Sequence, residues 1–368
     1  MKLMKLMKLF KISAKLLIIS MMIFVSSCDP EEERNMLSYD IPTSFNYVNA
    51  SYGGQTDRLN MLSELETYLK TANSGGVVDA AVAKSMYANE GYTWTSDAFA
   101  LEQPTKDLKS KTFDSQQAVV ETLIDQLAAL TASGTALTVS ADGKDSYMCD
   151  ENGMEPIQLI AKGIMGSCFY YQGTSVYLSA SKMDADNDVS ALTSDLDYTD
   201  MQHHWDESFG YLGAPIDYST TMTDGSVYWA KYGKKTLNGG LTTIDDLMQD
   251  GFILGRAAIN NEDYDTRDRA IARIQMEWEM IPVCAGLHYL NAAITNIGDD
   301  ALRNHELSEA IAFISALKYN AQASISSTEV EAIVASLGSN LNEVTPEMIN
   351  TALTSLAGAF SITNASEY

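Results

Sequence analysis

Apolar residues recur every three or four positions between about Asp263 and Ile297, the longest stretch of this kind in the sequence. The residues that follow the period are Ile271, Ile274, Trp278, Ile281, Leu287, Leu290 and Ile294. Because an α-helix turns once every 3.6 residues, this spacing places them along one face and predicts a helix. Pro282 lies inside the pattern and removes one backbone hydrogen bond. We therefore expect a kink or a break near Trp278 to Pro282.

The same period recurs in shorter stretches along most of the chain and predicts about ten helices in total. They lie near residues 56–74, 78–88, 115–132, 156–181, 199–213, 243–258, 263–297, 304–319, 328–337 and 345–356. The strand-favouring stretch 136–139 is too short to imply a sheet, and residues 214–240 are expected to form a loop. The sequence thus predicts an all-α fold of antiparallel helices, which can form two bundle-like halves before and after the polar segment 182–198.

The N-terminus has the pattern of an export signal. A lysine-rich segment is followed by the apolar run Leu16 to Val25, and small residues then precede Cys28. The run is shorter than the roughly 20 residues that a membrane-spanning helix needs. We therefore interpret residues 1–27 as a signal peptide and not as a transmembrane anchor.

Residues 25–28, Val-Ser-Ser-Cys, resemble the lipobox of bacterial lipoproteins. The resemblance implies that Cys28 carries the lipid, that residues 28–55 form a lipidated tether and docking segment, and that residues 56–368 form the helical domain. It implies an outer-membrane lipoprotein on the periplasmic or the cell-surface side. The acidic run that follows, 29–33, resembles the surface-export signal of Bacteroidota lipoproteins. The alternatives are an ordinary signal peptide with an incidental cysteine, and a solvated acidic tether.

The chain is strongly acidic, with a formal net charge of -25. Loss of residues 1–27 removes five lysines and no acidic residue, which leaves a charge of about -30. Such a surface repels phosphate backbones and attracts cations. The composition therefore argues against nucleic acid as a partner.

Two of the four histidines stand side by side, in the run His203-His204-Trp205-Asp206-Glu207. Thr199 can cap a helix here, and Gly213 can end it, so the run lies mid-helix. Glu207 is three residues from His204 and four from His203, so it can partner either one. The group could hold a metal ion or transfer a proton. The alternative is a surface ion pair of little energetic consequence.

Candidates for a further ligand are sparse. The zinc-protease pattern His-Glu-x-x-His is absent, so further ligands would come from other helices. His288 on the long helix is the best distant candidate, although a satisfied core histidine is an equal alternative. His305 lies at an expected helix start and is interpreted as a surface residue.

The run 201–215 resembles the signature of a Bacteroidota lipoprotein family catalogued as domain of unknown function 4856, and the runs 53–62 and 285–291 resemble its other segments. That family is similar to the imelysins, all-helical envelope proteins with a Gly-x-His-x-x-Glu motif. His204 and Glu207 match the His-x-x-Glu part, whereas Gln202 stands in place of the glycine.

The resemblance implies binding of a metal ion or a metal-containing ligand in iron or haem acquisition, beside an outer-membrane uptake transporter. His204, Glu207, His203 and His288 are then the candidate metal ligands, with iron, zinc or haem as the candidate cofactor. The alternatives are a metal-dependent peptidase and a helical lipoprotein that binds a partner without catalysis.

Overall fold

The computed structural model describes residues 37–193, 197–218, 225–235 and 244–368. The chain divides into two compact units, residues 1–41 and 42–368. The predicted signal peptide 1–27 and Cys28 lie outside the described residues, and the helices and strands described below belong to the second unit. No described helix is both long enough and apolar enough to cross a membrane.

The described chain is all-α, which confirms the predicted fold class. The helices in its first half are α3 (Gly53–Lys70), α4 (Ala80–Ala88), α5 (Asp114–Ala132), α6 (Pro156–Ile164), α7 (Ala180–Met183) and α8 (Asp200–Leu212). Two π-helical segments, η4 (Met165–Tyr170) and η5 (Gln172–Val176), continue α6. The short strands β1 (Thr138–Val139) and β2 (Ser146–Tyr147) pair antiparallel.

The second half contains α9 (Tyr228–Lys235), α10 (Ile244–Asp246), the π-helical segment η8 (Leu247–Ile253), α11 (Leu254–Asn260), α12 (Tyr264–Thr295), α13 (Asp300–Ala316), α14 (Ser327–Ala335) and α15 (Pro346–Ala359). Single turns of 3-10 helix connect several of these elements: η1 (Thr71–Ser74), η2 (Asp97–Phe99), η3 (Lys109–Lys111), η6 (Val189–Ala191), η9 (Leu317–Tyr319), η10 (Leu341–Glu343) and η11 (Ala365–Glu367).

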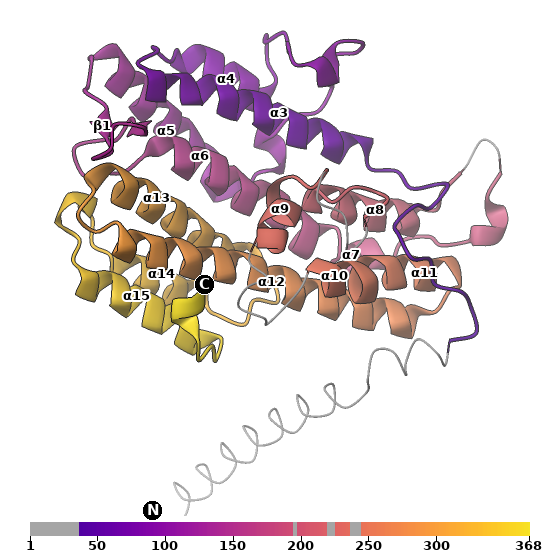
Figure 1. Ribbon diagram of the computed structural model, residues 1–368. Helices are drawn as coiled ribbons and strands as arrows, with labels where there is room; N and C mark the ends of the chain where they lie inside the picture. The colour runs from indigo at the N-terminus through magenta and orange to yellow at the C-terminus, as the bar shows by residue number, and fades with distance from the viewer. Residues whose placement is uncertain (1–36, 194–196, 219–224, 236–243) are drawn as a thin grey trace, which may run out of the picture. The chain divides into compact units, whose positions relative to one another are not determined.

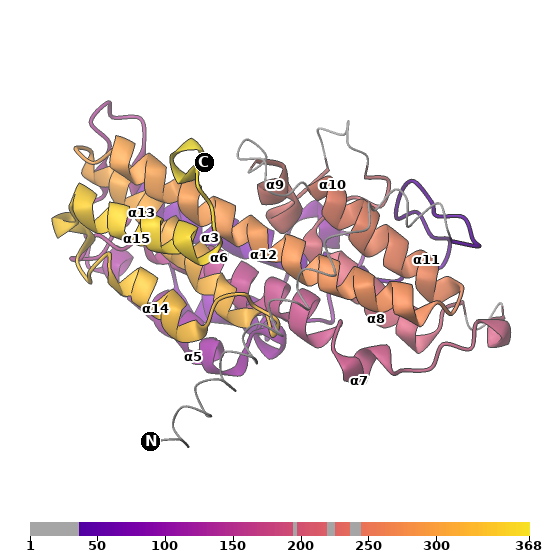
Figure 2. The same ribbon diagram turned by 90° about the horizontal axis from the view of Figure 1, so that it is seen from below.

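Helix α12 is shared by two groups of helices, as Figures 1 and 2 show. Its C-terminal half packs with α13, α14 and α15 around a cluster of buried side chains that includes Val283, Leu287, Leu290, Leu307, Ile314, Val330, Leu353 and Leu356. Its N-terminal half lies against η8 and α11. On α11, Gly255 lets the ring of Trp205 approach the backbone closely, because a side chain there would overlap the indole. This contact joins α8 to α11.

Of the kink or break predicted near Pro282, the break does not occur, because α12 is one helix from Tyr264 to Thr295. Pro282 and its neighbours Ile281, Val283 and Cys284 are all buried. Packing on both sides of the proline therefore outweighs the one missing backbone hydrogen bond.

Several other boundaries differ from expectation. The loop expected over 214–240 contains α9, where Trp229 and Ala230 are buried. Helix α3 begins three residues before Thr56, and α13 begins at Asp300 because Asp299 caps it. In the sequence, Thr328 and Glu331 fit a capping box for α14, but the box observed lies two residues earlier. It consists of Ser326 and Glu329, which fit the same Ser/Thr-x-x-Glu spacing.

The segment 42–52 docks on the helical core. The ring of Phe45 stacks on Phe209 of α8, with centroids 3.8 Å apart. The hydroxyl of Tyr47 donates to the Ile253 carbonyl at 2.8 Å, and the Ser51 amide donates to Asp206 Oδ2 at 3.0 Å. The segment thus covers α8 and η8.

Candidate functional site

Helix α8 holds the predicted motif rigidly. The Thr199 hydroxyl accepts from the Gln202 amide, and the Gln202 side chain accepts from the Thr199 amide, so both ends of a capping box are present. Gly213 ends the helix with a φ of 80°. The predicted limits of this helix are confirmed, and its histidines lie mid-helix.

We call His203, His204 and Glu207 the α8 cluster. His204 Nδ1 lies 3.2 Å from Glu207 Oε2, and His204 Nε2 lies 3.4 Å from Lys182 Nζ. Since an ammonium can only donate and an ionised carboxylate can only accept, Nδ1 of a neutral His204 carries the proton. Gln55 donates to the other oxygen of Glu207 at 3.0 Å. Both nitrogens of His204 are therefore engaged within the protein.

Burial raises the pKa of Glu207, but the hydrogen bond from His204, the charge of His203 and the hydrogen bond from Gln55 outweigh it, so its pKa lies below the ordinary value. His203 Nδ1 lies 3.0 Å from the Ser51 carbonyl, to which it donates. When the ring of His203 is neutral, its Nε2 atom carries a lone pair, and this atom lies 3.9 Å from Glu207 Oε2.

The two residues between His204 and Glu207 anchor the helix. Trp205 is fully buried, and its indole N–H donates to the Phe252 carbonyl at 3.0 Å. Asp206 Oδ1 accepts from Arg256 Nε at 2.8 Å, and both side chains are 0% exposed. This face of α8 is therefore part of the core.

The structure brings His203, His204 and Glu207 together but does not add His288. His288 lies on α12, exposed to solvent, with its ring edge-on to Tyr289. Among residues 37–193, 197–218, 225–235 and 244–368, no group of three or more His, Cys, Asp or Glu side chains is arranged to hold a metal ion. The α8 cluster offers two histidines and one carboxylate. Both ring nitrogens of one of these histidines, His204, are already paired with protein groups.

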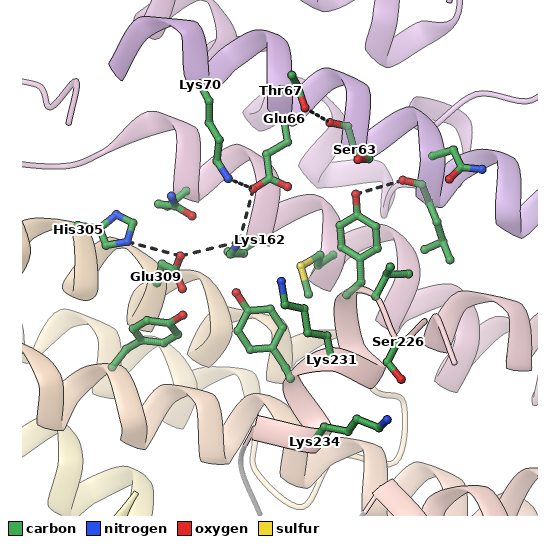
Figure 3. Close-up of a pocket in the computed structure, with 18 of the residues that line it drawn as sticks. Ser63, Glu66, Thr67, Lys70, Lys162, Ser226, Lys231, Lys234, His305 and Glu309 are labelled. Carbon is green, nitrogen blue, oxygen red and sulfur yellow. Dashed lines mark hydrogen bonds and ion pairs between the residues drawn. The ribbon is translucent and has the colours of Figure 1, made fainter. Parts of the chain in front are cut away.

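A second site lies where α3, α6, α9, α12 and α13 meet (Figure 3). It is a pocket of about 950 Å³ that we call the charged pocket. Its ionisable lining residues are Glu66, Lys70, Tyr147, Lys162, Tyr228, Lys231, Tyr232, Lys234, Tyr289, His305 and Glu309. This volume is at the upper end of the range for pockets that hold small organic molecules.

Charges of alternating sign run across one wall of this pocket, as the dashed lines in Figure 3 show. Lys70 Nζ lies 2.7 Å from Glu66 Oε1, and Lys162 Nζ lies 3.8 Å from the same oxygen. Lys162 is also 3.8 Å from Glu309 Oε1, which in turn lies 3.8 Å from His305 Nε2. The other ring nitrogen of His305 lies 2.6 Å from Oε2 of the buried Glu155.

The row of charges fixes the ionisation of its members. Burial opposes the charge on Lys162, but Glu309 and Glu66 outweigh it and raise its pKa. Burial likewise opposes the charge on Glu66, but Lys162 and Lys70 lower its pKa. Burial disfavours protonated His305, but the hydrogen bond and charge of Glu155 raise its pKa. Each shift favours the charged form.

Three buried polar atoms of the pocket lining lack hydrogen bonds of normal geometry from the described residues: Gln158 Oε1, Glu309 Oε2 and Ser226 Oγ. Gln158 is 3% exposed and Glu309 is 5% exposed, yet Gln158 Oε1 and Glu309 Oε2 receive no hydrogen bond of normal geometry from the described residues. A buried polar atom without a partner costs roughly 1–3 kcal/mol. A molecule in the pocket that donates to these atoms would recover that free energy.

Two features of the sequence point to this pocket. His305 and Glu309 are four apart on α13, the same spacing as His203 and Glu207. The interpretation of His305 as a surface residue is wrong, because its ring stacks on Tyr147 at 4.2 Å and pairs with Glu155. Lys162, a charge within an apolar helical run, was a second signal.

Comparison with known proteins gives one match. A family model described as a domain of unknown function (DUF4856) matches residues 46–363, which is most of the chain. No curated protein and no solved structure matches the chain. Inference about function therefore begins from the geometry of the two sites.

Proposed function

We propose that this chain, which belongs to the DUF4856 family, is a binding protein that captures a small polar molecule in the charged pocket. The observation that carries the proposal is a pair of buried acceptors, Gln158 Oε1 and Glu309 Oε2, that receive no hydrogen bond of normal geometry from the described residues. Buried polar atoms in folded proteins are nearly all paired. A bound molecule with suitable donors would supply the missing hydrogen bonds to these two oxygens.

The ionisation of the pocket favours binding over acid–base catalysis. A catalytic acid or base works best with a pKa near the working pH. Here the pKa of Glu66 is lowered and that of Lys162 is raised, so both move away from neutrality. Both groups are held charged, as in a site that orients a polar molecule.

We propose that the protein works at the cell envelope. Residues 1–27 are removed as a signal peptide, and lipid on Cys28 holds the chain at the outer membrane. Because the segment 42–52 is docked on α8 and η8, the tether is formed by residues 28–41. A binding protein held in this way could pass its ligand to an uptake transporter.

Filling the pocket tests the proposal. Ser63 lies on the exposed pocket wall of α3, so Ser63→Trp would occupy the cavity with little effect on the core. Small molecules released from the native envelope protein by denaturation would be identified by mass spectrometry. We expect a molecule with the wild type and none with Ser63→Trp at an unchanged melting temperature. Equal recovery from both proteins, or none from either, would overturn the proposal.

A metal ion or a metal-containing ligand at the α8 cluster is a second candidate function. The observation that favours it is the hydrogen bond from His203 Nδ1 to the Ser51 carbonyl, 3.0 Å long. Metal-binding histidines commonly donate their second nitrogen to a carbonyl in this way. Here His203 Nε2 and Glu207 Oε2 would be the ligands, and His204 would position Glu207.

Calorimetry on the metal-free full chain with Fe(II), Zn(II) and haem tests this second candidate. We expect binding that His203→Ala abolishes and His204→Ala weakens. Absence of binding by all three probes would exclude it without affecting the proposal for the charged pocket.

A further inference from the structure

We infer that the ligand of the charged pocket is a hydroxyl-rich organic anion, of the sugar acid or sugar phosphate type. This inference rests on the proposed function and adds the chemistry of the ligand. Three features of the pocket carry it: a lysine with no carboxylate within 4 Å among the described residues, the buried acceptors without hydrogen bonds of normal geometry, and the tyrosines of the lining.

The cation is Lys231 on α9, which points into the pocket in Figure 3. It is exposed and has no carboxylate within 4 Å among the described residues, whereas Lys70 and Lys162 are paired with Glu66. Four of the twelve lysines that follow Cys28 line this one pocket, against two carboxylates. In a chain of net charge -25, such a concentration of positive charge favours an anionic ligand.

The buried acceptors of the lining need hydrogen-bond donors. Gln158 Oε1 and Glu309 Oε2 can only accept, so the ligand must present O–H or N–H groups to them. An ammonium group beside Glu309 would also lie close to Lys162 and His305, each 3.8 Å from the other carboxylate oxygen. Like charges at that range repel. Neutral hydroxyl groups satisfy the acceptors without this repulsion.

The remaining walls suit a ring with polar edges. Tyr228, Tyr232 and Tyr289 line the pocket and offer apolar ring faces with a polar hydroxyl at the tip. Burial and the nearby carboxylates raise the pKa of all three, so each hydroxyl keeps its proton. The hydroxyl of Tyr228 donates to the Leu59 carbonyl at 3.1 Å, so the tyrosines contribute chiefly their ring faces. At about 950 Å³ the pocket exceeds the needs of an inorganic anion.

Calorimetric titration of the full-length chain tests the inference with five probes: glucuronate, glucose 6-phosphate, glucose, inorganic phosphate and acetate. We expect one or both acidic sugars to bind about tenfold or more tightly than glucose and the two simple anions. Glucuronate and glucose 6-phosphate distinguish a carboxylate from a phosphate as the anionic group. A preference for either supports the inference.

Three variants locate the contacts. Lys231→Ala should remove the preference for the acidic sugar over glucose, whereas Gln158→Leu should weaken both sugars by about tenfold, with unfolding curves recorded for each. Lys144→Ala is the matched control, since Lys144 lies on the exposed turn between β1 and β2. It should bind as the wild type does.

Two results overturn the inference while the proposed function stands. Glucose that binds as tightly as the acidic sugars would exclude the anionic group, and simple anions that bind as tightly would exclude the hydroxyl groups. Absence of binding by all five probes also overturns it. The mass spectrometry of wild type and Ser63→Trp then decides separately whether the pocket holds another molecule.

Discussion

The α8 cluster and the charged pocket are built from the same residue types in the same local pattern. Each has a histidine and a glutamate four residues apart on one helix, His203 with Glu207 on α8 and His305 with Glu309 on α13. Each also has a lysine beside this pair. The two sites differ in what their remaining polar atoms contact.

In the α8 cluster, nearly every polar side-chain atom is hydrogen-bonded to another group of the protein. Ser51 takes the proton of His203, Lys182 and Glu207 occupy the two nitrogens of His204, and Gln55 occupies the second oxygen of Glu207. In the charged pocket, buried acceptors and an exposed lysine are left open. This difference is the reason for our proposal that the pocket binds a ligand, whereas the hydrogen bonds of the α8 cluster are completed within the protein.

The largest expected effect is on the core beneath the α8 cluster. Arg256→Met would leave Asp206 buried without its cation, which should destabilise the protein by about 3–5 kcal/mol. Urea unfolding followed by circular dichroism would measure this loss. If α8 instead stabilises the fold little, the loss will be below 1 kcal/mol.

A double variant separates charge burial from lost packing. Asp206→Leu combined with Arg256→Met removes both charges, so it should recover much of the stability lost by Arg256→Met alone. A double variant as unstable as the single one would show that packing around Arg256 carries the effect.

The next prediction asks whether burial or a short ion-pair distance decides how much a lysine of the charged pocket stabilises the protein. Lys162 is 8% exposed, and its loss leaves Glu309 without its nearest lysine, so Lys162→Met should cost about 2–4 kcal/mol. Lys70 makes the shorter contact with Glu66, 2.7 Å, but its side chain is 50% exposed. Lys70→Met should therefore cost less than about 1 kcal/mol. Urea unfolding of both variants checks this order, and the reverse order would contradict it.

The two sites should respond to pH in opposite directions. The pKa of His305 is raised above its ordinary 6.5, mainly because the hydrogen bond and charge of Glu155 outweigh burial, with Glu309 assisting and Lys162 opposing. Its contribution is fully present below pH 6.5 and is lost as the pH rises through the higher folded-state value. His305→Gln should thus cost about 1.5 kcal/mol at pH 6 and progressively less toward pH 9.

Glu207 supplies the matched case. Its pKa is lowered from 4.5, so its contribution is present above pH 4.5 and is lost as the pH falls through the folded-state value. Glu207→Gln should cost about 1 kcal/mol at pH 7 and progressively less as the pH falls below 4.5. Unfolding free energies of wild type and both variants across this range check the two slopes. If the costs of the two substitutions changed with pH in the same direction, the assigned ionisation of either His305 or Glu207 would be contradicted.

Local signals carried much of the fold. Thr199 and Gly213 fixed the limits of α8, and Thr345 with Pro346 fixed the start of α15, because a helix end is determined by the few residues that cap it. The effect of Pro282 could not be predicted in this way. Whether a proline breaks a helix depends on tertiary packing, which a local sequence pattern does not contain, and α12 continues through Pro282.

The pocket was beyond sequence patterns for a similar physical reason. Its charges come from α3, α6, α9 and α13, which are far apart along the chain, and only the fold aligns Lys70, Glu66, Lys162 and Glu309. The α8 cluster was found because three of its groups lie within one and a half turns of a single helix. Such compact motifs are therefore easier to find than the sites that bind ligands.

The smallest expected effect concerns His288, the distant metal ligand predicted from sequence. It is exposed on α12 and contacts the edge of Tyr289, with ring centroids 5.1 Å apart. His288→Ala should therefore change the free energy of unfolding by less than about 0.5 kcal/mol. If the α8 cluster binds a metal, calorimetry should give His288→Ala the wild-type affinity, because His288 lies outside the cluster. A loss of affinity as large as that of His203→Ala would instead place His288 among the ligands, and it would make the α8 cluster the more open of the two sites.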